Sequence, residues 1–172
     1  MSSSTKSPLS QGRPAIFITG AASGIGRACA EHFAHQGWFV GLYDVNVDGV
    51  AALAQKLGAD HAVAGVLDVS DAEAWQRALA QFWGHSGQRL DVLFNNAGIL
   101  TTGAFATVPL VKHQAMLAVN VQGMMNGCHS AFSYLQQTPR SQVINMASAT
   151  AIYGQPELAS YSATKFAVRG FT

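Results

Sequence analysis

Charged residues are scarce in this sequence: they make up 11% of its 172 residues, whereas roughly 25% is usual for globular chains. The formal net charge of +1 provides no surplus of basic side chains to neutralise phosphates, which argues against nucleic acid as the main partner. No apolar run approaches the roughly 18 residues that a membrane span needs, and residues 1–12 lack the apolar core of a signal peptide. We therefore expect a cytoplasmic protein whose partners are neither nucleic acids nor membranes.

Cysteine is almost absent as well, since Cys29 and Cys128 are the only two and lie far apart. Two isolated cysteines provide neither the framework of a disulfide-rich fold nor a spacing that binds zinc. The six histidines are scattered without the spacing of metal ligands, so we expect no metal and assign them to surface or hydrogen-bonded positions. Both cysteines are expected to be small buried hydrophobic residues.

Hydrophobic residues, in contrast, make up 49% of the sequence. At roughly 150 residues per domain, the length corresponds to one domain. Residues 1–13 are rich in serine and contain almost no apolar side chains, so burial cannot offset the entropy that they would lose on ordering. We expect a disordered tail over residues 1–13 and one domain over residues 14–172.

From Pro14 onward, apolar runs typical of buried strands alternate with segments that carry apolar residues at helical spacing. In the helix expected at 71–83, Trp75, Leu79 and Phe82 share a face. In the first expected helix, Ile25, Cys29 and Phe33 likewise lie at helical spacing and share a face. The expected strands cover 15–19, 38–44, 61–69, 90–95 and 142–147, and the expected helices cover 24–36, 47–57, 71–83, 108–135 and 160 onward.

This alternation predicts an α/β fold with a doubly wound parallel sheet, because each parallel connection needs a crossover segment and helices then cover both faces. Sheets of this kind bind ligands beyond the carboxyl ends of their strands. Candidate binding residues are therefore those that follow the expected strands. They are Gly20–Gly26, Asp44, Asp68, Asn95–Gly98 and Ser148.

The first of these segments has glycines at positions 20, 24 and 26 and leads directly into a helix. Glycine permits a tight turn and the close approach of a pyrophosphate, whose charge is met by the N–H groups of the helix N-terminus. Ser23 and Ile25 lie between the glycines and belong to the same candidate site. A glycine-rich turn without a ligand stays an alternative, since the spacing differs from the G-x-G-x-x-G pattern.

Asp44 ends the second expected strand, 24 residues after Gly20. At this position a carboxylate can accept hydrogen bonds from the ribose hydroxyls of an adenine dinucleotide. A 2′-phosphate would be repelled by up to ~4 kcal/mol per pair of charges at about 4 Å and an effective dielectric constant of 20. Neither Ser23 nor Val45 supplies a compensating cation, so we expect NAD rather than NADP. The alternative is that Asp44 only starts the turn into the next helix.

The fourth expected strand ends in Asn95, Asn96, Ala97 and Gly98. The two small residues would let a flat cofactor lie against the backbone, and the two amides could link neighbouring strand ends. Taken alone, this segment is equally compatible with an ordinary turn.

Tyr161 and Lys165 lie four residues apart in the last expected helix and therefore share a face. An ammonium group close to a phenol favours the phenolate, which makes a tyrosine a better proton donor and acceptor at neutral pH. Such a pair is common by chance. Ser148 after the fifth strand and Asn120 in the long helix complete the groups that reduction of a carbonyl requires.

Together these segments resemble the short-chain dehydrogenase/reductase family in its shorter form. The resemblance covers residues 14–172, with Ala147 standing where many members have a serine. It implies a Rossmann fold and an NAD(H)-dependent oxidoreductase that interconverts a secondary alcohol and a ketone by hydride transfer. The matching motifs are Thr19-Gly20-x-x-x-Gly24-Ile25-Gly26, Asp44, Asp68-Val69, Asn95-Asn96-Ala97-Gly98, Asn120-Val121-x-Gly123, Ser148 and Tyr161-Ser162-Ala163-Thr164-Lys165.

The resemblance also implies individual roles. Tyr161 would be the general acid/base, and Lys165 would assist it and bind the nicotinamide ribose. Ser148 would polarise the substrate carbonyl, which places the substrate at Ser148 and Tyr161, and Asn120 would hold a water in a proton relay. The implied cofactor-binding residues are Gly20, Ser23, Gly24, Ile25, Gly26, Asp44, Asp68, Val69, Asn96, Ala97, Gly98, Tyr161 and Lys165.

Family members pair their subunits through the helices that match residues 108–135 and 160–172, which implies a homodimer or homotetramer. They also continue through a sixth strand, a mobile segment that covers the substrate, and a seventh strand. We therefore expect this sequence to be part of a longer protein. The alternative for a protein of 172 residues is a non-catalytic nucleotide-binding or interaction module.

Overall fold

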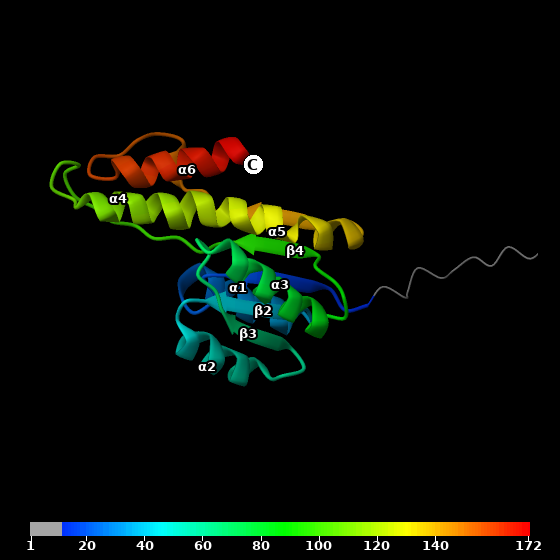
Figure 1. Cartoon of the computed structure of the whole chain (residues 1–172). Helices are drawn as coiled ribbons and strands as arrows, with labels where there is room; N and C mark the ends of the chain where they lie inside the picture. The colour runs from blue at the N-terminus through cyan, green and yellow to red at the C-terminus, as the bar shows by residue number, and fades with distance from the viewer. Residues whose placement is uncertain (1–11) are drawn as a thin grey trace, which may run out of the picture.

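The structure, a computed structural model, describes residues 12–172, whose strands form one parallel sheet (Figure 1). The strands are β1 (Ala15–Thr19), β2 (Phe39–Asp44), β3 (Ala62–Val66), β4 (Val92–Asn95) and β5 (Gln142–Asn145). Their order is β3-β2-β1-β4-β5, and each neighbouring pair is parallel. The predicted doubly wound α/β fold is thereby confirmed, although β3, β4 and β5 are shorter than the apolar runs suggested.

A helix follows each of these five strands. Their bounds are α1 (Gly24–His35), α2 (Val47–Leu57), α3 (Ala72–His85), α4 (Leu110–Leu117), α5 (Gly123–Gln137) and α6 (Ala159–Phe171). A π-helical turn, η1 (Ala118–Gln122), joins α4 to α5, and a 3-10 turn, η2 (Ala149–Ala151), follows β5. The single helix predicted over 108–135 is thus one segment with a widened turn around Asn120. Among the described residues, no helix combines the length and apolarity that crossing a bilayer would require.

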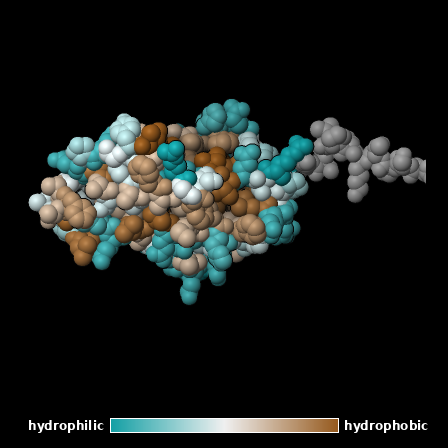
Figure 2. Space-filling model, turned by 90° about the horizontal axis from the view of Figure 1, so that it is seen from above, coloured by the Kyte–Doolittle hydropathy of each residue, from teal (hydrophilic) through white to brown (hydrophobic). Residues whose placement is uncertain are grey.

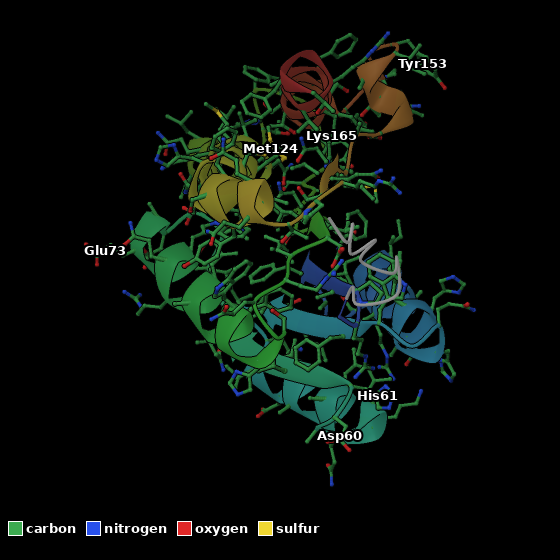
Figure 3. The ribbon with its side chains drawn as sticks, turned by 90° about the vertical axis from the view of Figure 1, so that its right-hand side faces the viewer. Asp60, His61, Glu73, Met124, Tyr153 and Lys165 are labelled. Atoms are coloured by element: carbon green, nitrogen blue, oxygen red, sulfur yellow. The ribbon has the colours of Figure 1, made fainter. Side chains whose placement is uncertain are left out.

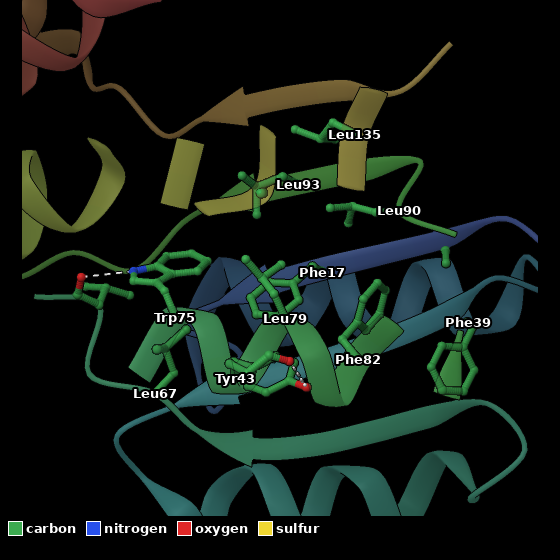
Figure 4. Packing of buried hydrophobic residues seen from close by; sticks show 14 residues of the cluster. Phe17, Phe39, Tyr43, Leu67, Trp75, Leu79, Phe82, Leu90, Leu93 and Leu135 are labelled. Carbon is green, nitrogen blue, oxygen red and sulfur yellow. Dashed lines mark hydrogen bonds between the residues drawn. The ribbon is translucent and has the colours of Figure 1, made fainter. Parts of the chain in front are cut away.

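On one face of the sheet, α3 and α5 cover an aromatic core (Figure 4). Trp75, Leu79 and Phe82 form the predicted buried face of α3, each less than 2% exposed. Their partners on the sheet include Phe17 and Tyr43, whose rings stack with centroids 4.2 Å apart. Burying aromatic side chains of this size is a large hydrophobic contribution, and stacking adds to it.

On the opposite face, α1 and α2 pack over the aliphatic side chains of the central strands. The most buried positions of α1 are Gly26, Ala30 and Ala34. Of the predicted face, Cys29 and Phe33 are partly buried and pack against the same core. Small residues at the most buried positions let α1 approach the strand ends more closely than a stripe of large ones allows. Ile25, 58% exposed, is displaced from the core towards the carboxyl ends of the strands.

The described residues begin at the amino ends of the strands, where Arg13 lies beside the start of β2. Arg13 donates from Nε to the carbonyl oxygen of Gly37 at 2.7 Å and from Nη2 to that of Trp38 at 2.8 Å. It also contacts the carbonyl oxygen of Asp60 and the ring of His61. Residues 1–11 of the expected tail lie outside the described residues, whereas Arg13 is attached to the domain.

The close approach of α5 to the sheet predicts an unequal response to two glycine substitutions. A Cβ atom on Gly127 would lie 2.7 Å from the Trp75 ring and closer still to Oδ1 of Asn95, whereas a Cβ on exposed Gly84 meets nothing within 4 Å. We expect Gly127→Ala to lower the free energy of unfolding by about 1–3 kcal/mol, as overpacking does. Gly84→Ala should raise it by up to about 1 kcal/mol through helix propensity. Urea unfolding of both variants checks this, and equal effects would contradict the packing described for α5.

Candidate active site

A cleft of about 540 Å³ lies beyond the carboxyl ends of the central strands. All but one of the predicted cofactor-binding residues line it, the exception being Gly26, which is buried beneath the turn. The lining residues that were predicted are Gly20, Ser23, Gly24, Ile25, Asp44, Asp68, Val69, Asn96, Ala97, Gly98, Tyr161 and Lys165. The apolar lining residues that were not predicted are Val45, Leu67, Ile99, Leu100, Val119 and Met146.

The glycine-rich turn after β1 has the backbone shape that only glycine adopts readily. Gly20 and Gly24 have φ values of 67° and 53°, and a Cβ on Gly20 would lie 2.9 Å from the Cα of Ala97. Ser23 occupies the N-cap of α1 without a side-chain capping bond. The N–H groups of the first turn therefore stay available to an anion in the cleft.

Asp44, at the end of β2, is held beside this turn. Its Oδ2 accepts a hydrogen bond from the N–H of Ala22 at 3.0 Å, and its Oδ1 accepts one from Asn46 at 2.9 Å. Asp44 thus starts the turn into α2 and also lines the cleft with its carboxylate. A role in the turn and a role in ligand binding are therefore compatible.

Thr19 and Asn96 join the ends of β1 and β4. Thr19 Oγ1 accepts from the N–H groups of Asn96 at 3.1 Å and Ala97 at 3.0 Å. In return, Nδ2 of Asn96 donates to the carbonyl oxygens of Thr19 at 2.9 Å and Gly20 at 3.3 Å. Thr19, 1% exposed, is a supporting residue that the sequence analysis named only as part of a motif.

The neighbouring amide, Asn95, links β4 to β5 by donating from Nδ2 to Oδ1 of Asn145 at 2.9 Å. Nδ2 also lies 3.4 Å from the sulfur of Cys128, and burial raises the pKa of that thiol. Cys128 and Cys29 are half-buried rather than fully buried. Over residues 12–172, no three His, Cys, Asp or Glu side chains gather as metal ligands.

Lys165 lies on the inner side of α6, where Figure 3 shows it below the helix. It is 4% exposed, and its Nζ donates to the carbonyl oxygen of Met146 at 2.7 Å. Nζ is 5.7 Å from the centre of the Tyr161 ring, so the predicted shared face exists. Burial lowers the pKa of Lys165, because an ammonium group loses hydration in this position.

Ser148 and Asn120 are not among the residues that line the cleft. Ser148 is the N-cap of η2, and its Oγ accepts from the N–H of Thr150 at 3.3 Å, which leaves its O–H free to donate. Asn120 is 2% exposed, and its Oδ1 accepts from the N–H of Ile99 at 2.8 Å. Its Nδ2 donates to the Ile99 carbonyl at 2.9 Å and to Thr164 Oγ1 at 3.1 Å, so both amide protons are bonded to protein groups.

Comparison with known proteins gives a consistent result. The sequence model of the short chain dehydrogenase family matches residues 14–172. The chain is 33% identical over 155 residues to a D-threitol dehydrogenase of Mycolicibacterium smegmatis, covering 89% of this chain and 59% of that protein. It is 35% identical over 164 residues to a 2-dehydro-3-deoxy-L-rhamnonate dehydrogenase (NAD(+)) of a Sphingomonas species, covering 94% and 64%.

Among solved structures, the chain is similar to a short chain dehydrogenase/reductase from Burkholderia phymatum in complex with NAD. The TM-score is 0.88 at 29% sequence identity, and the match covers 92% of this chain and 57% of that one. This chain therefore spans about 60% of the length of the two curated relatives named above.

The hydroxyl of Thr19 provides a test of how the strand ends are held. Thr19→Val keeps the shape but leaves the Ala97 N–H without its acceptor, while the Asn96 N–H keeps only its bond to the Phe94 carbonyl oxygen at 3.0 Å. We expect the free energy of unfolding to fall by about 1–3 kcal/mol, the cost of a donor left unsatisfied. Thr19→Ser retains the hydroxyl and should lose less, and chemical denaturation compares the two. A valine variant as stable as the serine variant would contradict this account.

Proposed function

This chain belongs to the short chain dehydrogenase family, and we propose that its protein is an NAD-dependent oxidoreductase that interconverts a secondary alcohol and a ketone. The proposal rests on one observation: the glycine-rich turn, Asp44, Tyr161 and Lys165 all line the same cleft. Segments that bind a dinucleotide and a pair that can exchange protons thus adjoin one space. Bound NAD would supply the hydride chemistry, while the protein supplies position and protons.

The described residues fit a dinucleotide. The uncapped start of α1 suits the pyrophosphate, and the carboxylate of Asp44 suits the adenosine ribose. Gly98 keeps space open at the other end, since a Cβ there would lie 3.3 Å from Oδ1 of Asn120 and 3.6 Å from Nζ of Lys165. We assign Asp68 and Val69 to the adenine, and Asn96, Ala97 and Gly98 to its ribose and the adjacent part of the cofactor.

In the proposed mechanism, Tyr161 donates a proton to the carbonyl oxygen in reduction and accepts one from the alcohol in oxidation. Lys165 would assist this exchange from the same helix face, with its Nζ 5.7 Å from the centre of the Tyr161 ring. The free O–H of Ser148 polarises the substrate carbonyl. Asn120 keeps the loop after β4 against α6 through its three hydrogen bonds, and one lone pair of Oδ1 is left for the water of a proton relay.

We further propose a homodimer or homotetramer. Viewed from above α6, Figure 2 shows apolar patches on the surface of the helical layer. Phe132 of α5 is 61% exposed, and Phe166 of α6 is 44% exposed. A second subunit that covered these rings would gain the hydrophobic energy that they lack in a single chain. A cytoplasmic location stays a prediction.

The cofactor preference is expected to depend on Asp44. In the complete gene product, Asp44→Ser removes a charged acceptor for the ribose, so the Kd of NAD should rise by about tenfold or more, as the loss of ~1.5–3 kcal/mol implies. Because the repulsion disappears too, NADP should bind more tightly than to the wild type. Titration of both cofactors by protein fluorescence measures this. Asp48→Ser, which removes an exposed carboxylate of α2 outside the cleft, is the matched control. Unchanged affinities for both cofactors would refute the role of Asp44.

Turnover is expected to depend on the phenol oxygen of Tyr161. A panel of secondary alcohols with NAD identifies the fastest substrate for the complete gene product. Tyr161→Phe should then reduce kcat by about 10²–10⁴-fold, as loss of a general acid/base does, with NAD binding retained. Lys165→Ala should impair both turnover and NAD binding. A phenylalanine variant that keeps most of its activity means that the proton is exchanged elsewhere, and NAD binding without turnover of any alcohol would favour the non-catalytic module.

A further inference from the structure

On α6, Tyr161 and Lys165 each follow a residue with a side-chain hydroxyl. Both hydroxyl groups form hydrogen bonds to the helical segment that runs from α4 into η1. Ser160 precedes Tyr161, and its Oγ lies 2.7 Å from Nδ1 of His113. Thr164 precedes Lys165, and its Oγ1 accepts from Asn120. The same four-residue spacing thus places two hydrogen bonds beside the two residues that the proposed function uses.

The partners of these hydroxyl residues also hold the loop between β4 and α4. Asn120 bonds to both backbone groups of Ile99, at the start of that loop. His113 approaches its far end, where Nε2 is 3.3 Å from the carbonyl oxygen of Phe105. We call the contacts of Asn120 with Ile99 and Thr164 the inner bridge, and those of His113 with Phe105 and Ser160 the outer bridge.

Both bridges connect the same three parts of the chain: the loop between β4 and α4, the helical segment from α4 to η1, and α6. His113 and Asn120 are seven residues apart, a separation that places side chains on one face of a helical segment. The ring of His113 is half-buried and packs on the Phe105 ring with centroids 4.8 Å apart at 35°. A further bond, from the N–H of Gly103 to the carbonyl oxygen of Glu157 at 3.1 Å, ties the same loop to the segment before α6.

One neutral tautomer of His113 satisfies both of its bonds. The carbonyl oxygen of Phe105 can only accept, so Nε2 must carry the proton, and Nδ1 is then free to accept from the hydroxyl of Ser160. The imidazole therefore couples the loop to α6 through opposite sides of one rigid ring.

We propose that His113 is a positioning residue for the reaction proposed above, acting through the outer bridge. It fixes the loop, whose first residues Ile99 and Leu100 line the cleft, against the turn of α6 that carries Tyr161. This inference rests on the proposed function. His113 bonds to Phe105 and Ser160 and to none of the residues assigned to the dinucleotide, so its loss should affect the use of the alcohol and leave the binding of NAD unchanged.

The first test compares kinetics of the complete gene product with the best alcohol of the panel. His113→Ala should lower kcat/KM by about ten- to a hundredfold, the range expected when reacting groups are displaced by up to about 1 Å. The Kd of NAD should stay at the wild-type value. His129→Ala, at an exposed position on α5, is the matched control and should behave as the wild type. An alanine variant at position 113 with wild-type kcat/KM, or with NAD binding weakened in proportion, overturns the proposal.

The second test assigns the effect to the outer bridge. His113→Gln retains an N–H group that can reach Phe105 but lacks the acceptor at Nδ1, and Ser160→Ala removes the same bond from α6. Since both substitutions break one hydrogen bond, the double variant should be no slower than the slower single variant. His113→Asn keeps the acceptor near Ser160 but loses the group that reaches Phe105. Because a bridge broken at either end no longer joins the loop to α6, this variant should also combine non-additively with Ser160→Ala. Effects that add in both cycles overturn the bridge.

A third measurement does not depend on activity. Hydrogen exchange followed by mass spectrometry should show faster exchange in residues 99–108 and 155–162 of His113→Ala, with α3 unchanged. Unchanged exchange in both segments overturns the outer bridge. If the wild type oxidises no alcohol, the proposed function fails and the kinetic role of His113 fails with it, whereas the exchange result still decides whether the bridge exists.

Discussion

The reversal of strand order between β1 and β4 is the constraint on which the site depends. From β1 the chain builds the sheet outward through β2 and β3, and it then crosses back to place β4 on the other side of β1. The connections that leave β1 and β4 therefore go to opposite faces, and a crevice opens between them. The glycine-rich turn and the Asn96–Gly98 segment form the two sides of that crevice.

Close packing keeps the crevice narrow. A Cβ on Gly26 would lie 2.7 Å from Nδ2 of Asn96 and would collide with the backbone of Gly20, so α1 can occupy its position only because no side chain is there. The hydroxyl of Thr19 then accepts from both N–H groups that follow β4, and the one on Ala97 would otherwise have no acceptor. Geometry and hydrogen bonding thus support the same arrangement of the strand ends.

The part of the cleft that Tyr161 and Lys165 line is positioned by packed helices rather than by the sheet. Tyr161 and Lys165 are carried by α6, which packs on α4 and η1. The side chains that connect these helices also hold the loop that forms one wall of the cleft. The π-helical turn lies at Asn120, consistent with the frequent occurrence of such turns at functional sites. The positions of Tyr161 and Lys165 and of the cleft wall are therefore coupled through shared hydrogen bonds.

Local sequence pattern by itself determined the order of strands and helices, including the bounds of α2 at residues 47 and 57, because apolar periodicity reflects burial along one element. It also identified the cleft residues at strand ends, since parallel strands place their carboxyl ends at one edge. Tertiary structure alone decided which face of α1 is buried. It also decided that the side chain of Asn120 forms hydrogen bonds to Ile99 and Thr164, and that His113 connects Phe105 to Ser160. These outcomes depend on how closely separate elements approach and on hydrogen bonds across as many as 47 residues of sequence, and no local periodicity encodes such distances.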